Sequence, residues 1–220
     1  MTPTMPQNVI AIVLAGGRSR RMGAAAPTGG KAAIPLGGES MLGRVCQAVS
    51  GEVGRVIVVA AEGQPLPSLP ESVEVTRDSA SDSGPLAAIR DGLAYALATG
   101  PLPEVAVLVS CDVPDLAPGV VRLLVENARE KAAWVVPVVG GHPQVLVSAM
   151  SAQVFDWLAA EAMSSLKSPR ALLDAITSAD SAHVKLIAES DLVAVDPALA
   201  SFADIDSPDD LALRDRTRVR

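Results

Sequence analysis

Hydrophobic positions along the chain follow two alternating patterns, short β-branched runs and longer Ala- and Leu-rich segments with helical spacing. The short runs predict strands at Val9–Leu14, Arg55–Ala60, Val73–Thr76, Val105–Val109, Trp134–Val138 and Gln144–Val147. The longer segments predict helices at Met41–Val49, Leu86–Ala98, Gly119–Lys131, Ala152–Met163 and Arg170–Ile176. This alternation is typical of repeated β-α-β units, so we expect an α/β fold around a mostly parallel sheet.

Two serine–proline pairs predict helix starts in the second half of the chain. Ser168-Pro169 and Ser207-Pro208 each place a capping hydroxyl before a proline at the first helical position. Asp209 and Asp210 then add favourable charge to the first turn of the later helix. No internal repeat is visible, and the proline-containing connector at 64–72 is too short for an interdomain linker. We therefore expect one domain over residues 1–220, with an ordered core from about 8 to 214.

Composition narrows the class of protein further. Of the 220 residues, 49% are hydrophobic but only 2% aromatic, so the core must consist of small aliphatic side chains. The net charge of −7 argues against nucleic acid and anionic lipid as partners. No segment approaches the roughly 20 apolar residues that a membrane helix needs. Cys46 and Cys111 are too few for a disulfide framework, which favours a reducing compartment, and we expect a cytoplasmic protein.

Glycines and basic residues gather in one stretch after the first expected strand. Residues 14–23 read Leu-Ala-Gly-Gly-Arg-Ser-Arg-Arg-Met-Gly, and Gly29, Gly30 and Lys31 follow. Such glycines let the backbone approach a ligand and present N–H groups to phosphate, whose charge Arg and Lys neutralise. The stretch predicts a triphosphate site; the alternative is a solvated surface loop.

Two well-known phosphate loops do not match this stretch. A dinucleotide fingerprint would need glycine two positions after Gly16, where the chain has Arg18. A P-loop ending at Lys31 would need glycine at Ala25 and Ser or Thr at Ala32. A nicotinamide-dependent oxidoreductase and a P-loop NTPase are therefore both disfavoured.

Carboxylates occur in two further places where they could hold a cation. Asp112 follows the strand expected at 105–109, and the carboxyl ends of parallel strands are where open α/β sheets bind ligands. It is a suitable ligand for Mg2+, whereas Asp115 more simply caps the next helix. Asp204 and Asp206 point to one side of an extended stretch, which suggests a metal site or a solvated acidic turn.

Taken in order, these motifs resemble the molybdenum cofactor guanylyltransferases, the MobA-like family of nucleotidyltransferases. The resemblance runs from about Val9 to Leu211 and rests on Leu-Ala-Gly-Gly, Arg-Met-Gly, a lysine, Gly-Pro-Leu-Ala at 84–87, Cys-Asp-Val-Pro at 111–114 and Asp-Ile-Asp-Ser-Pro at 204–208. It implies a single-domain, Rossmann-like three-layer α/β/α fold of the nucleotide-diphospho-sugar transferase type. It also implies GTP as donor, Mg2+ as cofactor, and a phosphorylated small molecule, molybdopterin, as acceptor.

The resemblance assigns roles to particular residues. The residues expected to bind GTP are Leu14, Ala15, Gly16, Gly17, Arg18 and Lys31, with Arg21 and Lys31 on the phosphates. Asp78 and Gly84 would line the guanine side. Asp112, with Asp206, would bind Mg2+. Lys31, Arg21 and Asp112 are the expected catalytic residues. We expect a monomer or a weak homo-oligomer.

Three features depart from the family pattern. Gly30 precedes Lys31 where aspartate is usual, the run Ala24–Gly30 is longer than usual, and Ala88 stands where glycine is common. The Asp204–Asp206 segment is closer to the cytidylyltransferase relatives, which keeps a cytidylyltransferase as an alternative. A non-catalytic nucleotide-binding module is the alternative of another class. His142, in the turn Gly-Gly-His-Pro-Gln, either lines the acceptor site or is a structural turn residue.

Overall fold

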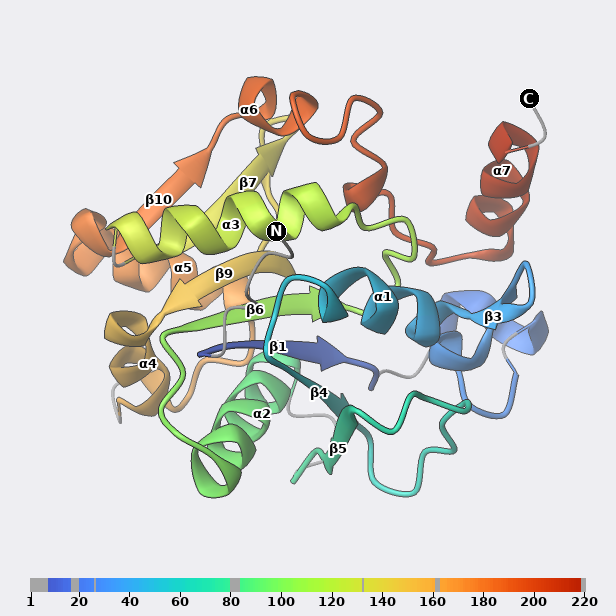
Figure 1. Ribbon diagram of the computed structural model, residues 1–220, viewed down its shortest axis with the longest axis horizontal. Coiled ribbons are helices and arrows are strands. Elements are labelled where there is room, and N and C mark those ends of the chain that lie inside the picture. The colour runs from blue at the N-terminus through green and yellow to red at the C-terminus, as the bar shows by residue number, and fades with distance from the viewer. Residues whose placement is uncertain are drawn as a thin grey trace, which may run out of the picture.

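A single eight-stranded sheet forms the centre of the computed structural model, which describes residues 8–16, 20–25, 27–79, 84–131, 133–160 and 163–218 (Figure 1). Its strands are β1 (Val9–Leu14), β4 (Arg55–Ala60), β5 (Val73–Arg77), β6 (Val105–Ser110), β7 (Trp134–Val139), β8 (His142–Pro143), β9 (Val147–Ser151) and β10 (Val184–Ile187). They lie in the order β10-β7-β9-β6-β1-β4-β5, with β8 paired to β7. β1, β4, β5 and β6 pair in parallel, as do β7 and β10, whereas β9 is antiparallel to both its neighbours.

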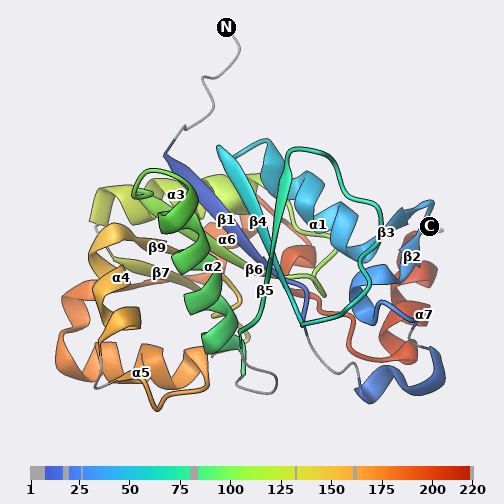
Figure 2. The same cartoon turned by 90° about the horizontal axis from the view of Figure 1, so that it is seen from below.

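Helices cover both faces of this sheet, as Figure 2 shows from below. They are α1 (Met41–Ser50), α2 (Pro85–Thr99), α3 (Pro118–Lys131), α4 (Ala152–Ala159), α5 (Pro169–Ala179), α6 (Glu189–Val193) and α7 (Pro208–Arg218). Side chains alternate between the faces with period two, so Val9, Ala11 and Val13 of β1 pack with α1 and α3. The intervening residues of β1 pack with α2, α4 and α5 on the other face. The expected three-layer α/β/α fold is confirmed.

Small residues let the helices lie directly on the sheet. A Cβ atom at Gly92 of α2 would lie 2.7 Å from Ile12 Cγ2 and 2.9 Å from Val59 Cγ2. Glycine at this position therefore removes a clash and brings α2 close to β1 and β4. This close contact agrees with a core built from Ala, Val, Leu and Ile rather than from aromatic rings.

The prediction of a strand at Gln144–Val147 was wrong. Residues 144–146 leave the sheet in a turn, and the strand is β9, which begins where the prediction ended. The polar residues Ser148 and Ser151 concealed it, although both are buried. The indole Nε1 of Trp134 donates a 3.0 Å hydrogen bond to Ser148 Oγ, which accounts for one of these polar groups in the core.

Helix boundaries were predicted well except at two ends, and one of these is the end of α5, which runs to Ala179 rather than Ile176. The helix expected at Ala152–Met163 ends at Ala159, because Ala160 has an extended backbone with φ −61° and ψ 130°. Ser168 caps α5 as predicted, accepting a 3.3 Å hydrogen bond from the N–H of Ala171. No helix in the described part of the chain is long and apolar enough to cross a membrane.

Candidate functional site

The carboxyl ends of β1 and β6 meet at one edge of the sheet. Leu14 pairs with Ser110, and the N–H of Cys111 donates a 3.0 Å hydrogen bond to the Leu14 carbonyl. The N–H of Ala15 donates to Val59 O at 2.9 Å, which ties the tip of β1 to β4 on its other side. The backbone that follows β1 and the Asp112 side chain are therefore neighbours, as the rule for parallel strands predicts.

A late segment of the chain reaches the same edge. The N–H of Ile205 donates a 2.8 Å hydrogen bond to the carbonyl of Asp112. Ile205 is 2% exposed and belongs to a small apolar cluster with Met22, Ile34, Leu36 and Met41. Since Met22 follows Arg21 and Ile205 precedes Asp206, this cluster brings the two charged residues together.

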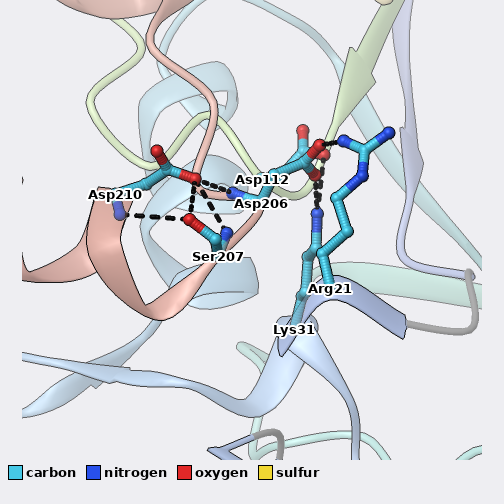
Figure 3. Close-up of polar contacts among 6 residues, drawn as sticks. All are labelled: Arg21, Lys31, Asp112, Asp206, Ser207 and Asp210. Carbon is cyan, nitrogen blue, oxygen red and sulfur yellow. Dashed lines mark hydrogen bonds and ion pairs between the residues drawn. The ribbon is translucent and has the colours of Figure 1, made fainter. Parts of the chain in front are cut away.

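Four charged residues, Arg21, Lys31, Asp112 and Asp206, lie close together (Figure 3). The carboxylate of Asp206 accepts hydrogen bonds from the guanidinium of Arg21 and from Lys31 Nζ. Lys31 Nζ also lies 3.6 Å from Asp112 Oδ2. The side chains of Lys31, Asp112 and Asp206 are 15%, 22% and 24% exposed, so solvent screens them only in part. We call these four residues the charged cluster; the sequence had singled out all of them.

The start of α7 holds Asp206 in place. One carboxylate oxygen of Asp210 accepts hydrogen bonds from the N–H of Asp206 at 3.0 Å, and from the N–H and hydroxyl of Ser207 at 2.8 and 2.7 Å. Ser207 Oγ in turn accepts from the N–H of Asp210 at 3.3 Å, which completes a reciprocal capping box. The cap at Ser207 is confirmed. Asp210, expected only to add charge, also fixes the backbone of Asp206; the Ser-x-x-Asp spacing was the signal.

The other acidic residues considered in the sequence, Asp204 and Asp115, lie outside the charged cluster. Asp204 is exposed, and Asp206 is the carboxylate of that pair that belongs to the charged cluster. Asp115 forms a two-point ion pair with Arg214 of α7, at 2.7 Å to Nε and 2.8 Å to NH2. Arg44 NH2 lies 3.6 Å from the same carboxylate. Asp115 therefore links α7 to the loop after β6, a structural role beyond the helix cap expected for it.

Those residues expected to bind the nucleotide that the structure describes lie near the same sheet edge. Gly16 is exposed at the tip of β1, and Gly17 and Arg18 lie outside the described residues. Asp78 follows β5 and donates its N–H to Ala60 O at 2.8 Å. Gly84 precedes α2 with φ +84°, and a Cβ there would lie 2.7 Å from Lys167 O. Only glycine fits this position.

Backbone conformation explains one departure from the family pattern. Gly30, which precedes Lys31, has φ +69° and ψ −157°, a region that is essentially restricted to glycine. An aspartate at this position would be strained. The glycine therefore belongs to the conformation of the longer loop and starts the short 3-10 turn η2 (Lys31–Ala33) that carries the lysine.

The donor set of the charged cluster fits Mg2+. This ion is usually held by one or two carboxylates together with phosphate oxygens of the substrate and water. Asp112 and Asp206 both face Lys31 Nζ and so supply two carboxylates at one point. Within the described residues no group of three or more His, Cys, Asp or Glu side chains could hold a metal without a substrate.

His142 is exposed in β8, which pairs with the end of β7. Gly140 and Gly141 before it both have positive φ, as the turn between these strands requires. The Gly140 N–H donates a 2.8 Å hydrogen bond to Glu189 Oε2. The structure thus confirms the turn, and the place of His142 in an acceptor site stays a hypothesis.

Both cysteines are buried, and their thiols are expected to be unreactive in the folded protein. Burial, with a contribution from Glu39, raises the pKa of Cys46 to about 12; burial, with a contribution from Asp112, raises the pKa of Cys111 to about 12. At pH 8 only about one thiol in ten thousand is then ionised, whereas an unfolded thiol reacts readily. A disulfide-exchange reagent should modify both cysteines only after denaturant is added. Rapid modification of the native protein would contradict this environment.

The fold and the charged cluster together define a nucleotidyltransferase. A family model for the MobA-like NTP transferase domain matches residues 11–200, and the chain belongs to this family. The "probable molybdenum cofactor guanylyltransferase" of Mycobacterium avium is 34% identical over 166 residues, which cover 74% of this chain and 80% of the relative.

Solved structures show the same fold. Molybdopterin-guanine dinucleotide biosynthesis protein A from Archaeoglobus fulgidus matches with a TM-score of 0.68 and 21% identity, covering 92% of this chain and 95% of its own. A nucleotidyl transferase from Methanothermobacter matches with a TM-score of 0.71 and 20% identity, covering 96% and 99%.

Proposed function

We propose that this protein is a Mg2+-dependent guanylyltransferase that transfers GMP from GTP to the phosphate of molybdopterin and releases pyrophosphate. The observation that carries the proposal is the charged cluster, in which two cations and two carboxylates lie beside the tip of β1. Relatives described as molybdenum cofactor guanylyltransferases support the choice of nucleotide and acceptor.

The arrangement of the four charges in the charged cluster suits the transfer of a nucleotidyl group. Asp112 and Asp206 would hold Mg2+, which when bound neutralises negative charge on the reacting phosphate. Lys31 and Arg21 stabilise the departing pyrophosphate. Both cations contact Asp206, so binding of the triphosphate requires that they exchange this carboxylate for phosphate oxygens.

The nucleophile needs little activation. A phosphate monoester has a second pKa of about 6 and is therefore largely dianionic at neutral pH. The charged cluster contains no histidine, and a general base is unnecessary for such an acceptor. The residues of the site contribute by orienting the two phosphates in line and by balancing their charge.

The guanine base would lie between Gly16 and Asp78. The Asp78 carboxylate is suited to accept hydrogen bonds from guanine N1–H and its exocyclic amine, donors that adenine lacks in this arrangement. Asp78 is half-buried, so its carboxylate is partly desolvated where it would meet these guanine donors. This argument favours GTP over ATP.

Gly16→Ala is expected to fold normally and to bind GTP at least about tenfold more weakly. An added Cβ would lie 3.5 Å from Ala61 N, an ordinary contact, so the fold itself has room for a methyl group. That methyl group would instead occupy the space through which the base approaches the backbone. Thermal unfolding and GTP titration measure the two effects separately. Unchanged GTP affinity would show that the base lies elsewhere.

A cytidylyltransferase is the second candidate, because the segment Asp204-Ile205-Asp206 resembles that branch. Calorimetric titration of the four NTPs with Mg2+ distinguishes the candidates. We expect GTP to bind most tightly, and tighter binding of CTP would assign the chain to the cytidylyl branch. Binding of GTP without pyrophosphate release in the presence of molybdopterin would instead indicate a non-catalytic module.

A further inference from the structure

We infer that Gln64 is a positioning residue, whose side-chain amide holds together the two ends of the loop that carries the phosphate-binding cations. The inference rests on the proposed function, because it assigns to Gln64 an effect on the triphosphate through Lys31. Gln64 lies in the proline-containing connector after β4, where the sequence pattern indicated only a connection.

Three backbone groups from three segments meet at this amide. Gln64 Nε2 donates hydrogen bonds to Ala15 O and to Gly29 O, both at 3.0 Å. Gln64 Oε1 accepts from the N–H of Ala61, also at 3.0 Å. Two carbonyls and one N–H fix the orientation of the amide, since only a primary amide offers two donors and an acceptor at one point. We call this arrangement the amide clip.

The backbone around Gln64 is itself held firmly. Gln64 donates its N–H to Ala61 O at 3.1 Å, and Gly63 has φ +68°, so residues 61–64 form a tight turn. Arg77, the last residue of β5, donates through NH1 to Ala61 O at 3.0 Å and to Gln64 O at 2.9 Å. The turn is therefore attached to the ends of both β4 and β5.

The clip reaches Lys31 through Gly29. Gly29 is buried, and a Cβ there would lie 2.7 Å from both Pro65 O and Ala33 Cβ. The Gly29 backbone therefore packs closely between Pro65 and the short turn η2, which begins at Lys31. A shift of Gly29 would displace Lys31 from its place between Asp112 and Asp206.

The other end of the clip is Ala15, which directly precedes Gly16. Without the clip, the chain between Ala15 and Gly29 would lose a fixed connection between its ends. Fixed positions for Gly16 and Lys31 reduce the ordering that ligand binding requires, so the clip raises triphosphate affinity without contacting the ligand. Glutamate at position 64 would have the same shape but would direct carboxylate oxygens at two carbonyl oxygens.

The test compares Gln64→Glu and Gln64→Ala with the wild-type protein, and uses Gln153→Glu on the exposed face of α4 as the matched control. Binding of Mg2+-GTP and of inorganic tripolyphosphate is measured by calorimetry, each in the wild-type and in the Lys31→Ala background. We expect both Gln64 variants to weaken both probes by about tenfold, and Gln153→Glu to leave them unchanged. In the Lys31→Ala background the loss should shrink below about twofold, because coupled residues are not additive.

Equal losses in both backgrounds, or no loss for either probe, would overturn the inference. Gly29→Ala disturbs the same clip at its Gly29 end. Its loss of binding should also shrink in the Lys31→Ala background, which tests the inference even if one Gln64 variant folds poorly. Tripolyphosphate carries no base and needs no acceptor, so its binding reports on the phosphate-binding residues and the clip, independently of guanine recognition and of transfer. If the Gln64 variants weakened tripolyphosphate binding as expected but the wild-type protein transferred no GMP, the proposed function would be refuted and the clip would not.

Discussion

Asp112→Asn is expected to lower kcat by at least about a hundredfold, equivalent to about 2.7 kcal/mol of transition-state stabilisation. The substitution keeps the shape of the side chain and removes one of the two carboxylates that would hold Mg2+. The fold should tolerate it, because the backbone carbonyl of Asp112 still binds the N–H of Ile205. The carboxylate itself takes part in one partly exposed ion pair at 3.6 Å, and such pairs contribute about 0–1 kcal/mol.

Steady-state kinetics with GTP and acceptor, together with thermal unfolding, measure these two effects. Asp174→Asn is the matched control, since Asp174 lies in an exposed ion pair with Arg170 on α5. That variant should retain full activity. An Asp112→Asn enzyme with wild-type turnover would show that the carboxylate is no metal ligand.

Lys31→Ala should reduce kcat/KM for GTP by about a hundredfold or more. Lysine is a mobile point charge that can follow the departing pyrophosphate, and alanine cannot replace it. In this variant Asp206 would keep its contact with Arg21. Asp112 and Asp206 would lose the cation that now lies between them. Because partly exposed ion pairs contribute little to stability, the melting temperature should fall by only a few degrees.

Lys131→Ala provides the comparison, because Lys131 ends α3 and pairs with the exposed Glu130. It removes the same charge away from the site and should leave GTP kinetics unchanged. If Lys31→Ala bound GTP and turned it over normally, the assignment of the phosphates to residues 16–31 would be wrong.

The sequence was sufficient to predict most of the sheet. β1, β4 and β6 are mostly apolar and rich in β-branched residues, because a parallel strand buried on both faces needs apolar side chains on both of its sides. β9 was misplaced because Ser148 and Ser151 look like surface residues, and only the packing of Trp134 shows that one of them is bonded inside the core. Short elements such as α6 and β10 carry too few residues for a clear period.

The members of the charged cluster were predictable, but their mutual contacts were not. Arg21 and Asp206 lie 185 positions apart, and their contact depends on the apolar packing of Met22 against the segment containing Ile205. Gln64 could not be found at all, since its partners are two carbonyls and one N–H of the backbone. Backbone groups are present at every position, so no pattern of residue types indicates such a contact.

Incubation with GTP, Mg2+ and molybdopterin tests the central claim most directly, with pyrophosphate release followed in time and the product identified by mass. We predict one pyrophosphate for each molybdopterin guanine dinucleotide formed, a much slower reaction with CTP or ATP, and the large loss of turnover given above for Asp112→Asn. Formation of the cytosine dinucleotide at a higher rate, or GTP binding without any pyrophosphate release, would contradict the account.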